Sequence, residues 1–336
     1  MLEKPTIPDD RIIACVKDAY AIAVAQITFL PLGVDVNAAV YRVVAEDGTA
    51  YFLKLRRGAF YEISVTLPKF LHEQGIAQII PPLVTRSGRL WADMGEFRLI
   101  LYPFVDGQNG YEVRLTDQHW IEFGAALRRI HMVVLPSTLR AAIPQETYSA
   151  QWREVVRTLL ARVATETWQE PVAAKTAAYL NAKRTEILDL IQRTERLAQR
   201  LQAEPLPMVV CHADIHAGNV LIDTQGKLHI VDWDAPILAP KERDLMFSGG
   251  GQFGSDRTPP QENALFYQGY GETEIDQHAL AYYRYERIID DIAAFGEQLL
   301  LTDEGGEDRE QAFLYLTYNF SPDGMIAVAV KADKTR

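Results

Sequence analysis

The feature that most constrains the fold of this chain is the stretch HADIHAGNVLIDTQGKLHIVDWD, residues 212–234. Histidine, aspartate and asparagine residues interrupt runs of valine, leucine and isoleucine, which favour strands. The segment VLID-TQGK-LHIVD predicts a β-hairpin that returns the chain to the end from which it started. The polar loop before the hairpin and Asp232 after it should therefore lie close together.

Two kinds of metal site could use such residues. His212 and His216 are four apart, as in the zinc motif HExxH, but Ala213 replaces the glutamate and no third ligand is near. The letters DIHAGN also resemble the opening of binuclear metallophosphoesterases, which need further Asp, Asn and His blocks downstream. After His229 the chain contains only His278. Both alternatives lack residues that they require.

Phosphoryl transfer fits the same stretch better. In the pattern H-x-D-x-x-x-x-N, which begins at His212, Asp214 would accept the proton of an attacking hydroxyl. Asn219 and Asp232 would supply oxygen ligands to the Mg²⁺ that neutralises nucleotide phosphates. His212 would orient the loop through hydrogen bonds. The spacing therefore predicts a catalytic base and two metal ligands around one point.

These motifs resemble the protein-kinase-like fold, with HADIHAGN in the place of the catalytic loop and VDWD in the place of the DFG segment. The loop, hairpin and D-W-D together are most similar to the aminoglycoside phosphotransferase family. APILAPKERDLMF and YYRYERIIDDIA extend the likeness, especially to members that phosphorylate spectinomycin. The resemblance implies an ATP- and Mg²⁺-dependent kinase for a hydroxyl of an aminoglycoside or aminocyclitol antibiotic.

The rest of the chain agrees with a bilobal α+β fold, in which a small β-rich lobe precedes a larger, mostly helical lobe. Residues 27–58 predict three strands with EDGT as a hairpin turn, and further strands are expected near Leu90–Trp91 and at Phe97–Val105. Residues 62–76 predict a helix closed by Gly75. DGQNG, residues 106–110, predicts a linker between an N-terminal lobe (1–105) and a C-terminal lobe (106–336). Helical periodicity follows near 120–130, 152–163, 187–201, 260–298 and 307–317.

In this fold a strand lysine binds the nucleotide phosphates and pairs with a helix glutamate. Lys54 in YFLKL and Glu62 are the expected pair. Alone, Lys54 would be an exposed strand lysine, and Glu62 a carboxylate favoured at a helix start. The other expected nucleotide contacts are backbone in the loop Gly33–Asn37 and around the hinge Tyr102–Phe104, with Phe104 stacking on adenine.

The acidic balance suits a cationic small-molecule partner. The chain has 45 acidic and 34 basic residues, a net charge of −11, and no basic cluster for nucleic acid. Such a charge is also common for solubility alone. Carboxylates and aromatic rings near the catalytic residues could bind a protonated amine. The candidates are Asp234, Glu242, Asp244, Tyr283 and Glu286. Asp244 could equally pair with Arg243, and the tyrosines could simply pack.

Other features bear on location and on rival functions. Cys15 and Cys211 form no CxxC motif, and there is no signal-peptide core and no apolar run of roughly 18 residues. We therefore expect a cytoplasmic monomer or weak homodimer with no membrane partner. A kinase for choline, homoserine or methylthioribose remains an alternative. A nucleotide-binding pseudokinase would lack the lysine, the aspartate or a metal ligand, and a protein kinase would carry an A-P-E motif after Asp232.

Overall fold

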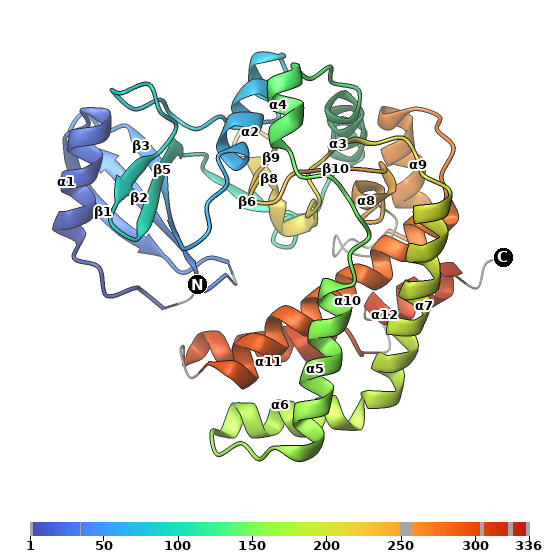
Figure 1. The fold of residues 1–336 in the computed structure, drawn as a ribbon. Helices are drawn as coiled ribbons and strands as arrows, with labels where there is room; N and C mark the ends of the chain where they lie inside the picture. Colours follow the sequence, from blue (N-terminus) through green and yellow to red (C-terminus); the bar gives the residue numbers. More distant parts are fainter. Residues whose placement is uncertain (1–2, 34, 249–256, 303–305, 322–324, 334–336) are drawn as a thin grey trace.

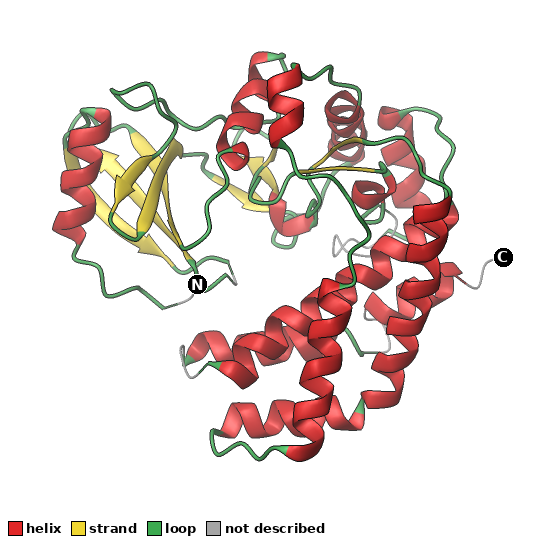
Figure 2. Cartoon of the chain, in the orientation of Figure 1, coloured by secondary structure: helices red, strands yellow, loops and turns green. Residues whose placement is uncertain are grey.

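The N-terminal region is a five-stranded antiparallel sheet in the order β1-β2-β3-β5-β4 (Figures 1 and 2). The computed structural model describes residues 3–33, 35–248, 257–302, 306–321 and 325–333. The strands are β1 (Val24–Leu30), β2 (Ala38–Ala45), β3 (Ala50–Arg57), β4 (Ala92–Met94) and β5 (Phe97–Pro103). This confirms the three strands predicted over 27–58 and the turn at EDGT, where Gly48 adopts a φ of +86°. The strand expected near Leu90–Trp91 begins only at Ala92.

One face of the sheet packs against helix α1 (Asp9–Tyr20). Ile12 and Val16 of the helix are fully buried in a cluster that includes Leu53 and Leu55 of β3. Because successive side chains of a strand point to opposite faces, Lys54 lies on the other face. The packing of this small core therefore directs Lys54 away from α1.

Helix α2 (Ile63–Glu73) contributes to two clusters of buried residues. Its buried residues Ile63, Leu67 and Leu71 cluster with the apolar side chains of the helical region. The segment after it reaches the hairpin, where the N–H of Ile230 donates to the carbonyl of Gln78. Val65 of α2 packs with Ile100 of β5, and Figure 1 shows α2 beside α4 (Ser137–Ala142). Gly75 follows the helix with a φ of +80°, as predicted.

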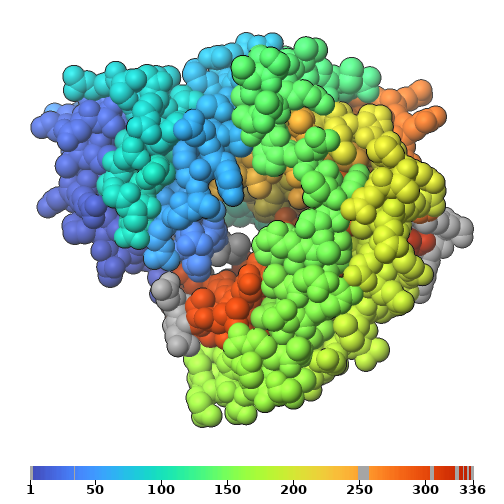
Figure 3. Space-filling model, in the orientation of Figure 1, coloured from blue at the N-terminus to red at the C-terminus, as the bar shows by residue number. Residues whose placement is uncertain are grey.

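The remainder of the chain is mostly helical, which confirms the predicted architecture. Helix α10 is the central element and packs against α5, α6, α7, α11 and α12. The helices not yet named are α3 (Asp117–His131), α5 (Gln151–Thr165), α6 (Pro171–Ala182), α7 (Arg184–Ala203), α8 (Glu242–Leu245), α9 (Pro259–Tyr270), α10 (Gln277–Leu301), α11 (Glu307–Tyr318) and α12 (Met325–Asp333). The space-filling view shows an open gap between the blue N-terminal residues and the green and orange helices (Figure 3).

Short strands carry the predicted hairpin. They are β6 (Gly107–Asn109), β7 (Val209–Cys211), β8 (Val220–Asp223), β9 (Leu228–Ile230) and β10 (Ile237–Ala239), with a 3-10 turn η1 (Ala217–Asn219) before β8. The predicted linker is wrong in one respect, because Gly107–Asn109 form a strand that pairs with β8. A Cβ atom at Gly107 would lie 2.4 Å from the carbonyl oxygen of Ile222, so this close approach requires glycine. The division into lobes at 105/106 stays a prediction.

Within the described residues, none of the helices combines the length and apolar character needed to cross a membrane.

Candidate active site

The loop between β7 and η1 is held in place by the buried carboxylate of Asp244 on α8. Asp244 accepts hydrogen bonds from the backbone N–H groups of His212 (2.9 Å) and Ala213 (2.7 Å). Ala213 has a φ of +73°, which residues other than glycine rarely adopt. The two bonds therefore stabilise a strained loop conformation immediately before Asp214.

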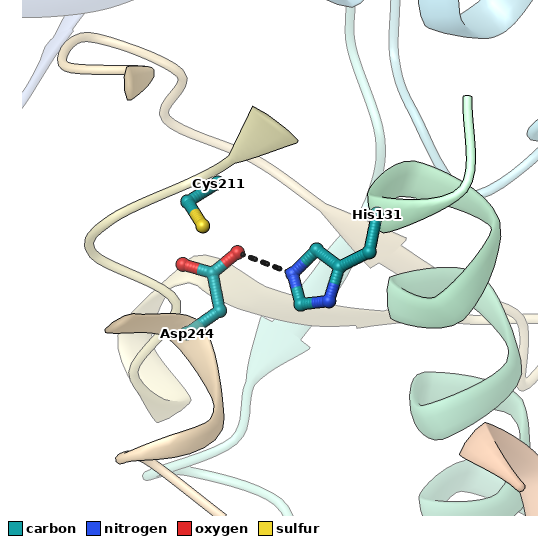
Figure 4. Close-up of side chains that lie close together, drawn as sticks. All are labelled: His131, Cys211 and Asp244. Atoms are coloured by element: carbon teal, nitrogen blue, oxygen red, sulfur yellow. Dashed lines mark hydrogen bonds and ion pairs between the residues drawn. The ribbon is translucent and has the colours of Figure 1, made fainter. Parts of the chain in front are cut away.

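Asp244 is itself fixed by a buried cluster with His131 and Cys211 (Figure 4). His131 Nε2 donates to Asp244 (3.1 Å), and the hydroxyl of Tyr270 donates to His131 Nδ1 (2.8 Å). The Cys211 thiol points to the carbonyl of Pro240 (3.6 Å). Burial raises the pKa of this thiol well above its usual value. Through Asp244 the cluster supports the loop.

The carboxylate of Asp214 forms an ion pair with the guanidinium group of Arg287 on α10. His216 Nε2 lies 3.7 Å from the second carboxylate oxygen. Burial alone would raise the pKa of Asp214, but the charges of Arg287, His216 and His212 lower it below its ordinary value. Arg287 also donates from Nε to Asp291 (3.1 Å). Arg287 was not among the residues predicted from the sequence, and its available signal was its i,i+4 spacing from Asp291.

One hydrogen bond closes this loop on itself, and two others connect it to the residues after β9. The side-chain amide of Asn219 donates to the carbonyl of Asp214 (2.7 Å). The backbone carbonyl of Asn219 accepts from the N–H of Val231 (3.0 Å), and His212 Nε2 donates to the carbonyl of Val231 (2.9 Å). Asp232, the next residue, has a φ of +64°. The structure thus brings His212, Asp214, Asn219 and Asp232 together, as the spacing predicted.

Lys54 joins the sheet to this group of residues. Its Nζ atom lies 2.7 Å from Asp232 Oδ1 and 2.7 Å from Asp234 Oδ1, and only 9% of the residue is exposed. Burial would lower the pKa of Lys54, but the two carboxylates raise it above its usual value. Arg56 contacts the other oxygen of Asp234 (3.3 Å) and pairs with Asp35. The result is a partly exposed cluster of alternating charge around the buried Lys54, which we call the sheet-side cluster: Asp35, Lys54, Arg56, Asp232 and Asp234.

The predicted pair between Lys54 and Glu62 is wrong in this structure. Glu62 is exposed at the start of α2, whose apolar face is buried in the core of the helical region. The carboxylates of Asp232 and Asp234 take the place beside Lys54 that Glu62 was expected to fill. Asp234 was expected to contact substrate, but it pairs with Lys54 and Arg56 instead.

The remaining residues expected at the nucleotide lie around the same cluster. Gly33 has a φ of +81°, and the N–H of Asn37 donates to Asp35, which links the loop to Arg56. Val34 lies outside the described residues. At the hinge, burial raises the pKa of Tyr102, whose hydroxyl is near Lys54.

Phe104 differs from what we expected at the hinge. Its N–H donates to the carbonyl of Ala50 (3.2 Å), and its ring lies under Arg42 at 5.1 Å. That backbone donor is therefore already used within the protein.

The other expected substrate contacts divide into two groups. Glu242 and Asp244 are buried, with exposed fractions of 3% and 1%. Glu242 accepts a hydrogen bond from the N–H of Asp276 (3.1 Å) and Asp244 holds the loop, so a direct substrate contact is wrong for both. Arg243, the alternative partner of Asp244, pairs with Glu146 (3.1 Å). Tyr283 and Glu286, in contrast, line a cavity.

This cavity, of about 220 Å³, lies between α5, α8 and α10 beside the loop of Asp214. Its acidic lining residues are Glu146, Glu286 and Asp290, and its basic ones are Arg243 and Arg287. Arg153 pairs with Glu286 at 2.5 Å. Burial raises the pKa of Asp290 to about 6. Trp152, Tyr282 and Tyr283 add aromatic surface. Acidic groups and aromatic rings in one cavity can bind an ammonium group.

Comparison with known proteins covers nearly the whole chain. A family model described as a phosphotransferase enzyme family, APH, matches residues 28–281. The structure of spectinomycin phosphotransferase APH(9)-Ia with ADP and spectinomycin has a TM-score of 0.88 and 35% identity, over 98% of this chain and 99% of that one. Its AMP-bound complex has a TM-score of 0.82 and 34% identity, over 96% and 98%. This agreement confirms the predicted fold.

A more distant relative is protein StrN from Streptomyces griseus. It is 25% identical over 192 residues, which are 55% of this chain and 57% of StrN. The chain thus spans little more than half the length of that relative.

Proposed function

Because the chain belongs to the APH phosphotransferase enzyme family, we propose that it transfers the γ-phosphoryl group of ATP to a hydroxyl of an aminoglycoside or aminocyclitol antibiotic, specifically spectinomycin. The support for ATP is that the similar enzyme APH(9)-Ia has been solved with ADP and with AMP. The support for spectinomycin is 35% identity, over almost the whole chain, to that enzyme bound to spectinomycin. A cytoplasmic location, where ATP is available, and a monomeric or weakly dimeric state are part of this proposal.

One observation carries the chemistry. Asn219 donates to the carbonyl of Asp214 and accepts from Val231, the residue before Asp232, while Lys54 reaches Asp232 from the sheet. A base, two oxygen donors and a buried cation are thereby fixed around one point. Phosphoryl transfer requires this combination, because its catalysis rests on positioning and on neutralising phosphate charge.

In this proposal Asp214 orients the acceptor hydroxyl and takes its proton as the oxygen attacks the γ-phosphorus. Lys54 binds the phosphates and neutralises charge that develops on them. His212 holds the loop of Asp214 beside Asp232 through its hydrogen bond to the carbonyl of Val231. Backbone near Gly33, Asn37, Tyr102 and Phe104 would contact the nucleotide.

The side chains of Asn219 and Asp232 fit Mg²⁺. The amide nitrogen of Asn219 is used by Asp214, which leaves its side-chain oxygen as the donor, and Asp232 adds a carboxylate. Mg²⁺ prefers such oxygen ligands. When bound, it would shield the charge of the nucleotide phosphates.

The test uses purified protein, ATP and Mg²⁺ with spectinomycin, other aminoglycosides, choline, homoserine and methylthioribose, followed by product mass. We expect spectinomycin to gain one phosphoryl group, with no product in the absence of ATP. If only choline, homoserine or methylthioribose is phosphorylated, the acceptor of this enzyme is a metabolite and not an antibiotic. Absence of any product would contradict the proposed activity.

A further inference from the structure

The proposed catalytic base is already occupied by a cation from the protein itself. Arg287 pairs with Asp214, and 27% of the arginine side chain and 38% of the aspartate side chain are exposed. An aspartate in an ion pair is a weaker proton acceptor, and its lone pairs are not available to a hydroxyl. Because exposed ion pairs exchange readily with solvent, the partial burial of this one makes it a more persistent contact.

Arg287 has a second carboxylate to which it can move. Its Nε atom is bound to Asp291 (3.1 Å), which also accepts from the side chain of Asn319 (3.4 Å). The guanidinium group therefore bridges Asp214 and Asp291. Loss of the Asp214 contact would leave Arg287 anchored to its own helix, so release requires only a side-chain rotation.

The cavity supplies a reason for that movement. Both Arg287 and Asp290 line it. The other two acidic lining residues have cations of their own, since Glu146 pairs with Arg243 and Glu286 with Arg153. No ion pair joins Asp290 to any residue that the structure describes. A ligand ammonium beside Asp290 would lie next to the guanidinium group, and like charges at that separation repel.

We infer that Arg287 is a specificity-determining residue, which covers Asp214 in the empty enzyme and releases it when a cationic acceptor fills the cavity. This inference rests on the proposed function. A ligand shifts such an equilibrium only through different interactions with the two arrangements. An ammonium group interacts differently with the two arrangements, because it repels Arg287 from Asp214. Water carries no charge and leaves the pair intact.

The consequence is discrimination against water as the acceptor. In hydrolysis, a water oxygen bonds to the γ-phosphorus, the bond from that phosphorus to the β–γ bridging oxygen breaks, and ADP leaves with the electron pair. The proton of the water passes to Asp214. With Arg287 on Asp214, this proton has no acceptor, so ATP should be conserved until the antibiotic arrives.

The experiment compares ATP hydrolysis without acceptor in the wild type and in Arg287→Gln, Arg287→Lys and Arg157→Gln. Arg157 on α5 pairs with Glu154 and Glu195 and does not line the cavity, so it is a matched loss of an arginine ion pair. We expect hydrolysis to rise about tenfold in Arg287→Gln. Arg287→Lys should stay near the wild type, as should Arg157→Gln. Unchanged or slower hydrolysis in Arg287→Gln, at an unaltered melting temperature, would overturn the inference.

Asp291→Asn gives a prediction of the opposite sign. Without the second anchor, Arg287 should bind Asp214 more persistently, so the acceptor-dependent rate falls and hydrolysis does not rise. A rise in hydrolysis would mean that Asp291 merely positions Arg287 on Asp214, which contradicts release towards Asp291. If Arg287→Gln fails to fold, Arg287→Lys and Asp291→Asn still decide the question. A wild type that phosphorylates no acceptor would end the proposed function, while the hydrolysis comparison would still test Arg287.

Discussion

The candidate active site holds two charged clusters, and they are built from different parts of the chain. In the sheet-side cluster, Lys54 of β3 meets Asp232 and Asp234, which are 178 and 180 residues away. In the helix-side cluster, which we define as Asp214, Arg287, Asp290 and Asp291, every member comes from the helical region. The first cluster therefore joins the sheet to the helical region, whereas the second lies within the helical region. Nucleotide binding should therefore respond to the placement of the two regions, and acceptor binding to local charge.

The largest effect is expected at the helix-side cluster. Asp214→Asn keeps the shape of the side chain but removes the proton acceptor, so phosphoryl transfer should fall at least about 1,000-fold. Nucleotide affinity should remain, because Lys54 and Asp232 are untouched. Product mass and calorimetric titration with ATP check both statements. Asp189→Asn, an exposed carboxylate on α7, is the control. Turnover within about tenfold of the wild type would remove Asp214 from the mechanism.

A smaller loss is expected at the sheet-side cluster. Lys54→Met removes the cation between Asp232 and Asp234, so kcat/KM for ATP should fall about 100-fold, with KM for the acceptor little changed. Steady-state kinetics with each substrate varied in turn separate the two effects. Lys69→Met on α2, which breaks the surface pair with Glu73, is the matched control. An equal loss of acceptor affinity would mean that the two clusters are not independent.

The smallest effect concerns the pH dependence of stability. Burial raises the pKa of Asp290 to about 6, so the folded protein binds this proton more tightly than the unfolded chain. The contribution of Asp290 to the free energy of unfolding should therefore fall as the pH rises from about 4 to about 6 and stay constant above that range. Asp290→Asn cannot titrate. The stability of the wild type relative to this variant should decrease by about 1–2 kcal/mol over that range, as measured by urea unfolding. If the free energies of unfolding of the wild type and of Asp290→Asn change in parallel with pH, Asp290 is not desolvated.

The contrast between the clusters also separates what could be predicted from what could not. The sequence pattern predicted that Asp214, Asn219 and Asp232 lie together, because a hairpin of fixed length connects the loop of the first two to Asp232. Lys54 was identified from the strand that carries it. Its partner was not, because the apolar face of α2 packs into the helical core and leaves Glu62 exposed. Arg287 was missed because helix periodicity indicates a face but not which element lies opposite it.

The structure also corrected the substrate contacts predicted for the acidic residues after the hairpin. Asp234, Glu242 and Asp244 follow Asp232 closely, which suggested substrate contacts. In the fold, Asp234 faces Lys54, Glu242 is bonded to the N–H of Asp276, and Asp244 accepts two N–H groups of the loop. Each of these partners comes from a segment distant in sequence, so no local pattern could assign it.

By itself, the sequence determined the strands of the N-terminal sheet, most of the helices, and the polar hairpin with its base and oxygen donors. These features depend on hydrogen bonds and side-chain periodicity within short segments. Only the tertiary structure decided the partners of the charges: Lys54 with Asp232 and Asp234, Asp244 with the loop, and Arg287 with Asp214. Such partners are set by how α2, α8 and α10 pack, and packing depends on the whole core at once.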